Sequence, residues 1–247
     1  MNNFDHLITQ KDCYNHVLDT FNTNNIQYVI IRGFRFLPVK PDTDLDMIIH
    51  PNSYEKFKKI YKDLHEANLI RVQPPKKYTE NNKAVYYTPL FTEKHFKEGD
   101  HLPGRYYRFD TYSDLFFYKD GEGGNKPKNA IILNQLFKKY LFDNKILTNN
   151  YYIPDPISEI ILLIYRNLYD FGGNWCRRKH TNRINNLINN IDQKEFMKVC
   201  NFCFSEEQNI LQHIINKQFN KITRPIQKLN LFIIRKKGME KEIIENI

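Results

Sequence analysis

The first half of the chain carries its apolar residues in short runs, and the second half carries them at helical spacing. The runs over 26–32 and 45–49 are rich in β-branched residues, which predicts two buried strands. Further short apolar runs predict strands over 69–72, 84–90 and 106–118. Around these strands, apolar residues at helical spacing predict helices over 6–24, 53–66 and 130–142.

The pattern changes at Pro154-Asp-Pro156, where Asp155 is suited to cap a helix and Pro156 to begin it. Just before this point, residues 145–153 predict a short hairpin that turns at Asn149-Asn150. From there, a period near 3.6 residues predicts helices over 157–171, 177–191, 193–203, 206–221 and 224–236. We therefore expect an α+β chain: a mixed β-sheet with flanking helices over 1–153, followed by an α-helical C-terminal region over 154–247.

Three aspartates, Asp42, Asp44 and Asp46, alternate along the chain where it enters the predicted 45–49 strand. Successive side chains of a strand point to opposite faces, so Asp44 and Asp46 project from one face. Adjacent carboxylates repel each other unless a cation lies between them, and Mg²⁺ shares such oxygen ligands with substrate phosphates. The sequence thus predicts metal-assisted chemistry on a nucleotide. In the alternative interpretation, Asp42 stabilises a turn and the other two are solvated.

A third acid lies in the aromatic run over 106–118. Asp110 interrupts this predicted strand, and Asp114 lies four residues later on the same face. Burying a lone carboxylate is costly, which favours Asp110 as a metal ligand beside Asp44 and Asp46. Metals bridged by such carboxylates activate an oxygen nucleophile and neutralise a leaving phosphate. Asp114 is the other candidate for the third ligand, and an edge strand whose polar face meets water is the alternative for both acids.

These residues together resemble the DNA polymerase β-type nucleotidyltransferase superfamily: a strand ending in glycine, a loop, an Asp-x-Asp pair and an acid on a later strand. Within the superfamily, Asp42-Thr-Asp-Leu-Asp46 is most similar to the acidic cluster of the LicD/fukutin-type branch. The resemblance covers roughly residues 26–118. It implies a nucleotidyltransferase-like core, Mg²⁺ or Mn²⁺ held by Asp44, Asp46 and Asp110, and transfer of a phosphate-containing group from a CDP-linked donor to a glycan.

The sequence departs from this superfamily after the first strand. Members usually have Gly-Ser or Gly-Gly there, in contact with donor phosphates, whereas Gly33 is followed by Phe34. We expect Arg32 and Arg35 to hold phosphate beside Gly33, because a guanidinium forms two hydrogen bonds to phosphate oxygens. Plain surface charge is the alternative for both arginines, and a simple turn is the alternative for Gly33.

A second candidate cluster surrounds Gly172-Gly173, between two predicted helices. Its members are Arg166, Asp170, Trp175, Lys179, His180 and Arg183. Lys179 and Arg183 are four residues apart on a helix, a spacing that would let both contact one phosphate. His180 would act as general base for an acceptor hydroxyl. The alternative is a helix–helix turn with Trp175 in the core and the cations in water.

Composition limits the class of protein. The chain has 247 residues, of which 41% are hydrophobic, enough for one substantial core or two modest domains. It has no apolar run long enough to span a bilayer and no signal-peptide pattern at its start, so we expect a cytoplasmic protein. The net charge of +9 is spread along the chain without a recognisable nucleic-acid-binding motif. The apolar and basic residues over 221–237 predict either a closing helix or peripheral contact with an anionic membrane.

The sequence leads to one main hypothesis and two rivals. The main hypothesis is a metal-dependent transferase that moves a nucleotidyl or phosphate-linked group from a nucleotide donor to an acceptor hydroxyl, with a glycan as the expected acceptor. The first rival is a sugar-nucleotide glycosyltransferase in which an Asp-x-Asp pair binds Mn²⁺ and the donor diphosphate. Against it, the acidic cluster follows only one strand, too early for a complete nucleotide-binding half to precede it. The second rival is a catalytically silent nucleotidyltransferase-like binding module, which the bulky residue after Gly33 favours.

Overall fold

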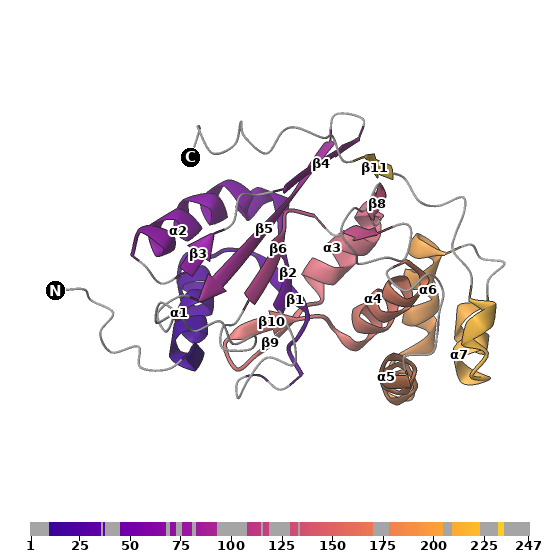
Figure 1. Ribbon diagram of the computed structural model, residues 1–247. Helices are drawn as coiled ribbons and strands as arrows, with labels where there is room; N and C mark the ends of the chain where they lie inside the picture. Colours follow the sequence, from indigo (N-terminus) through magenta and orange to yellow (C-terminus); the bar gives the residue numbers. More distant parts are fainter. Residues whose placement is uncertain are drawn as a thin grey trace.

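The protein is a mixed α/β structure, shown by a computed structural model (Figure 1). The described residues are 10–35, 37, 45–67, 70–72, 76–80, 83–92, 108–114, 116–118, 129–132, 134–169, 178–204, 209–222 and 232–234. Their helices are α1 (Gln10–Thr23), α2 (Tyr54–Glu66), α3 (Gln135–Asp143), α4 (Pro156–Tyr169), α5 (Arg178–Ile188), α6 (Gln193–Cys203) and α7 (Ile210–Ile215), with 3₁₀ turns at Pro51–Ser53 and Phe219–Lys221. Their strands are β1 (Tyr28–Arg32), β2 (Leu45–Ile49), β3 (Ile70–Val72), β4 (Lys76–Glu80), β5 (Lys83–Thr92), β6 (Arg108–Tyr112), β7 (Phe116–Tyr118), β8 (Asn129–Ile132), β9 (Ile146–Thr148), β10 (Tyr151–Ile153) and β11 (Phe232–Ile234). The coarse expectation of an α+β chain with a mixed sheet and helices is confirmed.

Nine of the described strands form one sheet in the order β1-β2-β6-β5-β4-β11-β8-β7, with β3 paired to β5. Every pairing among them is antiparallel except that of β2 with β6. The remaining described strands, β9 and β10, form the predicted hairpin. Asn149 and Asn150 at its turn have φ of 43° and 78°, a conformation that Asn adopts more readily than most residues. The parallel pairing places β2 beside β6, and these are the two strands that were expected to carry the acids.

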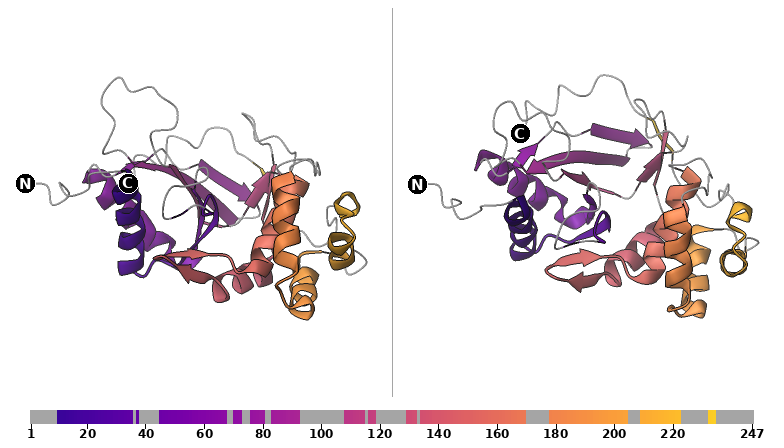
Figure 2. Two further views of the ribbon diagram at one scale, coloured as in Figure 1. Left: turned by 90° about the horizontal axis from the view of Figure 1, so that it is seen from below. Right: turned by 60° about the horizontal axis from the view of Figure 1, so that its bottom comes forward.

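The pleat of β2 sends alternate side chains into two different hydrophobic cores. Leu45, Met47 and Ile49 pack with α1 and α2 on one face of the sheet. Ile48, together with Val29 of β1, packs with α3 to α7 on the other face. Figure 2 shows the same arrangement, with α1 and α2 on one side and the C-terminal helices on the other. The even-numbered positions of β2 therefore face the C-terminal helices.

The helix α4 begins where the sequence predicts. Asp155 caps it, because its carboxylate oxygens accept hydrogen bonds from the backbone N–H groups of Ile157 and Ser158 at 3.0 and 3.3 Å. The helix is buried along most of its length. Within the part of the chain that the structure describes, no helix is long and apolar enough to cross a membrane.

The aromatic run over 106–118 is not the single strand that was predicted. It contains β6 and β7, separated by a bend at Ser113 and Asp114. β6 lies beside β2, whereas β7 pairs with β8 at the far end of the sheet. Strand propensity reflects β-branched and aromatic content, and it does not show where the chain leaves one strand for another.

Two predicted helices contain strands instead. Residues 130–132 belong to β8, and α3 begins only at Gln135, after the N-cap Asn134. Phe232–Ile234, inside the predicted helix 224–236, forms β11 between β4 and β8. The prediction of a wholly helical C-terminal region is therefore wrong, since its described end returns to the sheet of the N-terminal region.

Candidate functional site

Two aspartates on neighbouring strands form the centre of the candidate site. The parallel register of β2 and β6 pairs Asp46 directly with Asp110. Adjacent strands lie about 4.8 Å apart and paired residues share a face, so both side chains project toward the C-terminal helices. Each residue is only 6% exposed. The fold thus brings together two of the three expected metal ligands.

Arg32 is aimed at Asp46 by an irregularity in β1. Tyr28 and Ile30 pack toward α1 and α2, and strict alternation would send Arg32 the same way. The register with β2 shifts between Ile30 and Arg32, so Arg32 comes opposite Asp46. Such a bulge adds one residue to a strand and re-aims the side chain that follows. As a result, the Arg32 Nε lies 2.6 Å from the Asp46 Oδ2.

Gly33 follows this arginine, immediately after the end of β1. Its φ is 84°, in the left-handed region that glycine adopts without steric cost. It is also buried, so the chain turns here in a confined space. Arg35, the second arginine expected to hold phosphate, is exposed beyond the turn.

A second guanidinium reaches Asp46 from the C-terminal helices. Arg166 of α4 places its Nη1 3.8 Å from the Asp46 Oδ2, and 19% of its side chain is exposed. The sequence grouped Arg166 with the cluster around Gly172-Gly173, because neighbouring positions gave no sign of a contact across the sheet. The site therefore combines Arg32, Asp46, Asp110 and Arg166, drawn from three strands and one helix.

Asp114 does not continue the strand that carries Asp110. It lies in the bend after β6, and both of its carboxylate oxygens accept hydrogen bonds from the Lys138 Nζ of α3, at 2.7 and 2.6 Å. The expectation that Asp114 shares a strand face with Asp110 is therefore wrong. Asp42 and Asp44 lie outside the described residues.

The second predicted cluster serves mainly to join α4 and α5. Arg183 donates from Nε and Nη2 to Glu159, both at 2.7 Å, and these hydrogen bonds raise the pKa of Arg183. His180 is buried, with its Nδ1 3.2 Å from the Asn167 Nδ2. Lys179 is exposed. Asp170, Trp175 and the two glycines lie outside the described residues. His180 is as buried as Asp46 and Asp110, and its role as a base for an acceptor hydroxyl stays a prediction.

The charges of the site determine what it can bind. Asp46 and Asp110 offer hard oxygen ligands, and carboxylates on adjacent strands repel unless a cation compensates them. Arg32 and Arg166 provide such compensation for Asp46. Across the described ranges, no group of three or more His, Cys, Asp or Glu side chains could hold a metal ion. A complete ligand set would need Asp44, which those ranges do not include.

Comparison of the chain with protein-family models, with curated proteins and with solved structures finds no match.

Proposed function

We propose that this chain is a metal-dependent transferase that moves a nucleotidyl or phosphate-linked group from a nucleotide donor to an acceptor hydroxyl. The observation that carries the proposal is the register that pairs Asp46 with Asp110 on parallel strands, on one face of the sheet. Both residues are buried, and a buried pair of like charges needs compensating positive charge, which Arg32 and Arg166 give to Asp46 and which a metal ion would extend to the pair. Oxygen ligands of this kind suit Mg²⁺ or Mn²⁺.

The proposed ligand set is Asp46, Asp110 and Asp44, in a core like that of the nucleotidyltransferases, with a CDP-linked or other nucleotide donor and a glycan as acceptor. When bound, the metal would neutralise the donor phosphates and lower the pKa of the acceptor hydroxyl. Arg32 and Arg166 both contact Asp46. A guanidinium group can donate two hydrogen bonds at once to the oxygens of a phosphate. Their role in the proposal is to hold the donor phosphate beside the two carboxylates, in a site sheltered from bulk water by the C-terminal helices.

One observation favours the silent binding module as a second candidate. The Arg32 Nε lies 2.6 Å from the Asp46 Oδ2, so an arginine already contacts an oxygen that a metal ion would use. In an active enzyme, Arg32 would have to move from Asp46 to the donor phosphate when metal and donor bind. In a silent module, the ion pair persists and only stabilises the fold.

A thermal-shift screen of nucleotides and CDP-linked donors, with and without Mn²⁺, tests the proposal. A ligand at a hundred times its Kd stabilises the folded state by about 2.7 kcal/mol, which raises the Tm of a chain this size by about 5–10 °C. We expect such a shift for the wild type only when donor and Mn²⁺ are both present, and no such shift for Asp46→Asn or Asp110→Asn. Asp63→Asn, an exposed acid of α2, is the matched control and should behave as wild type. A folded wild type that responds to no donor contradicts the transferase proposal.

A further inference from the structure

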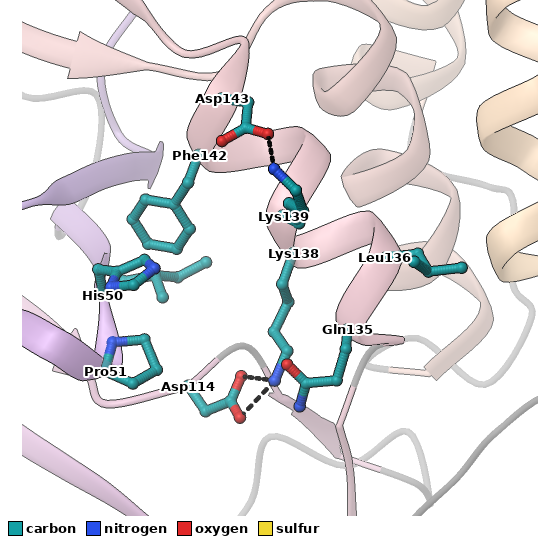
Figure 3. A pocket seen from close by; sticks show the side chains of 10 residues that line it. His50, Pro51, Asp114, Gln135, Leu136, Lys138, Lys139, Phe142 and Asp143 are labelled. Atoms are coloured by element: carbon teal, nitrogen blue, oxygen red, sulfur yellow. Dashed lines mark hydrogen bonds and ion pairs between the residues drawn. The ribbon is translucent and has the colours of Figure 1, made fainter.

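A pocket of about 480 Å³ lies at the end of β2, between this strand and α3 (Figure 3). Ile48 and His50 line it from the side of β2, and Asp114 lines it from the bend after β6. Ile48 shares a strand face with Asp46 and lies two residues, or about 7 Å, along the strand, whereas His50 lies four residues, or about 14 Å, away. The pocket therefore begins at Ile48 and extends along the strands away from the Asp46–Asp110 pair.

The charged groups of the pocket compensate one another. Lys138 donates two hydrogen bonds to the Asp114 carboxylate, at 2.7 and 2.6 Å, and Lys139 forms an ion pair with Asp143. Burial lowers the pKa of His50, and the positive charge of nearby Lys145 lowers it further, so the imidazole is neutral near pH 7. A pocket with paired charges and a neutral histidine gives no general attraction to an anion. It suits an uncharged ligand.

The hydrogen-bonding groups of the pocket point to a ligand with several hydroxyls. The His50 Nδ1 accepts a hydrogen bond from the Asn52 backbone N–H at 3.2 Å, so the proton of the neutral ring is on Nε2, which is a donor. A lysine ammonium has three N–H donors, of which Asp114 takes two from Lys138. Pro51 and Phe142 supply an apolar wall on the side of His50 (Figure 3). Hydrogen-bond donors beside an apolar wall match a ring that carries hydroxyl groups on its edge.

We propose that this pocket binds the acceptor substrate, an uncharged ring or polyol bearing several hydroxyl groups, beside the Asp46–Asp110 pair. The assignment deepens the proposed function and rests on it. One acceptor hydroxyl oxygen bonds to the donor phosphorus, the phosphorus–oxygen bond to the donor's leaving group breaks with its electron pair, and the hydroxyl proton passes to water. His50 and Lys138 position the acceptor through hydrogen bonds to its other hydroxyls.

Ligand-observed saturation-transfer NMR without nucleotide tests the binding step. The probes are glucose, N-acetylglucosamine, ribitol and myo-inositol, with glucose 6-phosphate as the charged comparison. Gln135 lies exposed beside the Lys138–Asp114 pair (Figure 3), so Gln135→Trp fills the pocket from its rim. Asn186→Trp, an equivalent change at an exposed position of α5, is the matched control. We expect at least one uncharged probe to bind wild type and Asn186→Trp, and to bind Gln135→Trp at least tenfold more weakly. Binding of no uncharged probe, binding that Gln135→Trp leaves unchanged, or binding of the phosphate alone overturns the proposal.

Adding Mn²⁺ then tests whether the pocket adjoins the carboxylates. A paramagnetic ion held by Asp46 and Asp110 broadens the proton signals of a probe bound nearby, and this effect should vanish in Asp46→Asn while the probe still binds. If Mn²⁺ binds the protein but leaves the probe signals unchanged, the acceptor role is wrong although the transferase proposal stands. If Mn²⁺ does not bind, the transferase proposal fails, and the acceptor role fails with it.

Discussion

At the scale of single residues, His50 links the strand of the candidate site to the pocket beside it. Its ring meets the ring of Phe142 edge-on, with centroids 4.8 Å apart. Burial lowers the pKa of His50, as do the charges of Lys145 and Lys138, and Asp143 acts in the opposite direction. The folded protein therefore binds a proton at His50 less readily than the unfolded chain does. Stability from this group is present above the unfolded pKa of about 6.5 and is lost as pH falls below it.

Replacing His50 by glutamine should reduce the acid sensitivity of the fold. We expect the free energy of unfolding of wild type, measured in urea between pH 7.5 and 5, to fall more steeply toward acid than that of His50→Gln. The matched change His65→Gln, on the exposed side of α2, should follow the wild-type curve. Parallel curves for wild type and His50→Gln would mean that the histidine titrates equally in both states.

The residues of the site differ in how far the sequence revealed them. Asp46 and Asp110 were predictable because acids inside apolar strands are costly to bury and so stand out. Arg32 was expected to hold phosphate. Its contact with Asp46 depends on a bulge in β1, which the alternation of side chains along a strand does not predict. The contact of Arg166 with Asp46 was not predicted, since it depends on how α4 crosses the sheet.

At the scale of elements, α4 is the helix that brings the C-terminal half of the chain to the candidate site. Its first turn is held by Asp155, whose carboxylate accepts two backbone hydrogen bonds, and Arg166 lies near its other end. Loss of the cap should weaken the whole helix, because these two backbone N–H groups would lose their partner in a buried setting.

Asp155→Ala should lower the free energy of unfolding by about 1–2 kcal/mol, the usual cost of removing a helix cap. Asp155→Asn keeps an oxygen that can accept both hydrogen bonds, and it removes a carboxyl group whose pKa is raised by burial. We therefore expect the asparagine variant to stay close to wild type in urea denaturation. Equal losses in the two variants would show that a single side-chain oxygen is not enough to cap α4.

Elements with an explicit local signal were predicted well, and elements defined by distant partners were not. Asp155-Pro156 marked the start of α4, and Asn149-Asn150 marked the β9–β10 turn, because both depend on neighbouring residues alone. The bend at Ser113 and Asp114 was missed, as was the strand nature of Phe232–Ile234. In β11 each residue pairs with a segment far away in sequence, and such pairing overrides a helical pattern.

At the scale of the whole molecule, β11 joins two parts of the sheet. It pairs with β8 through Phe232, Ile233 and Ile234, and with β4 through Ile234 and Thr79. Without it, β4 and β8 would each present an unpaired edge. The C-terminal part of the chain therefore contributes to the N-terminal sheet as well as to the helical core.

Ending the chain at residue 231 should expose β4 and β8 to solvent exchange. We expect hydrogen exchange of the amides in 76–80 and 129–132 to be at least tenfold faster in this variant than in the full chain. A chain ending at residue 234 keeps β11 and serves as control, with exchange rates like those of the full chain. Faster exchange in both truncated chains to the same extent would show that β11 is not the segment that protects these strands.

The parallel pairing of β2 with β6 has a consequence for the order of folding. Asp46 and Asp110 come together only when the long stretch of chain between them has closed into a loop. Closing this loop costs conformational entropy before the strand pairing can contribute any stabilising free energy. Helices and the β9–β10 hairpin need no such closure and can form early. We therefore expect the acid pair to form late in refolding, so that a chain with native helical content can still lack the proposed donor site.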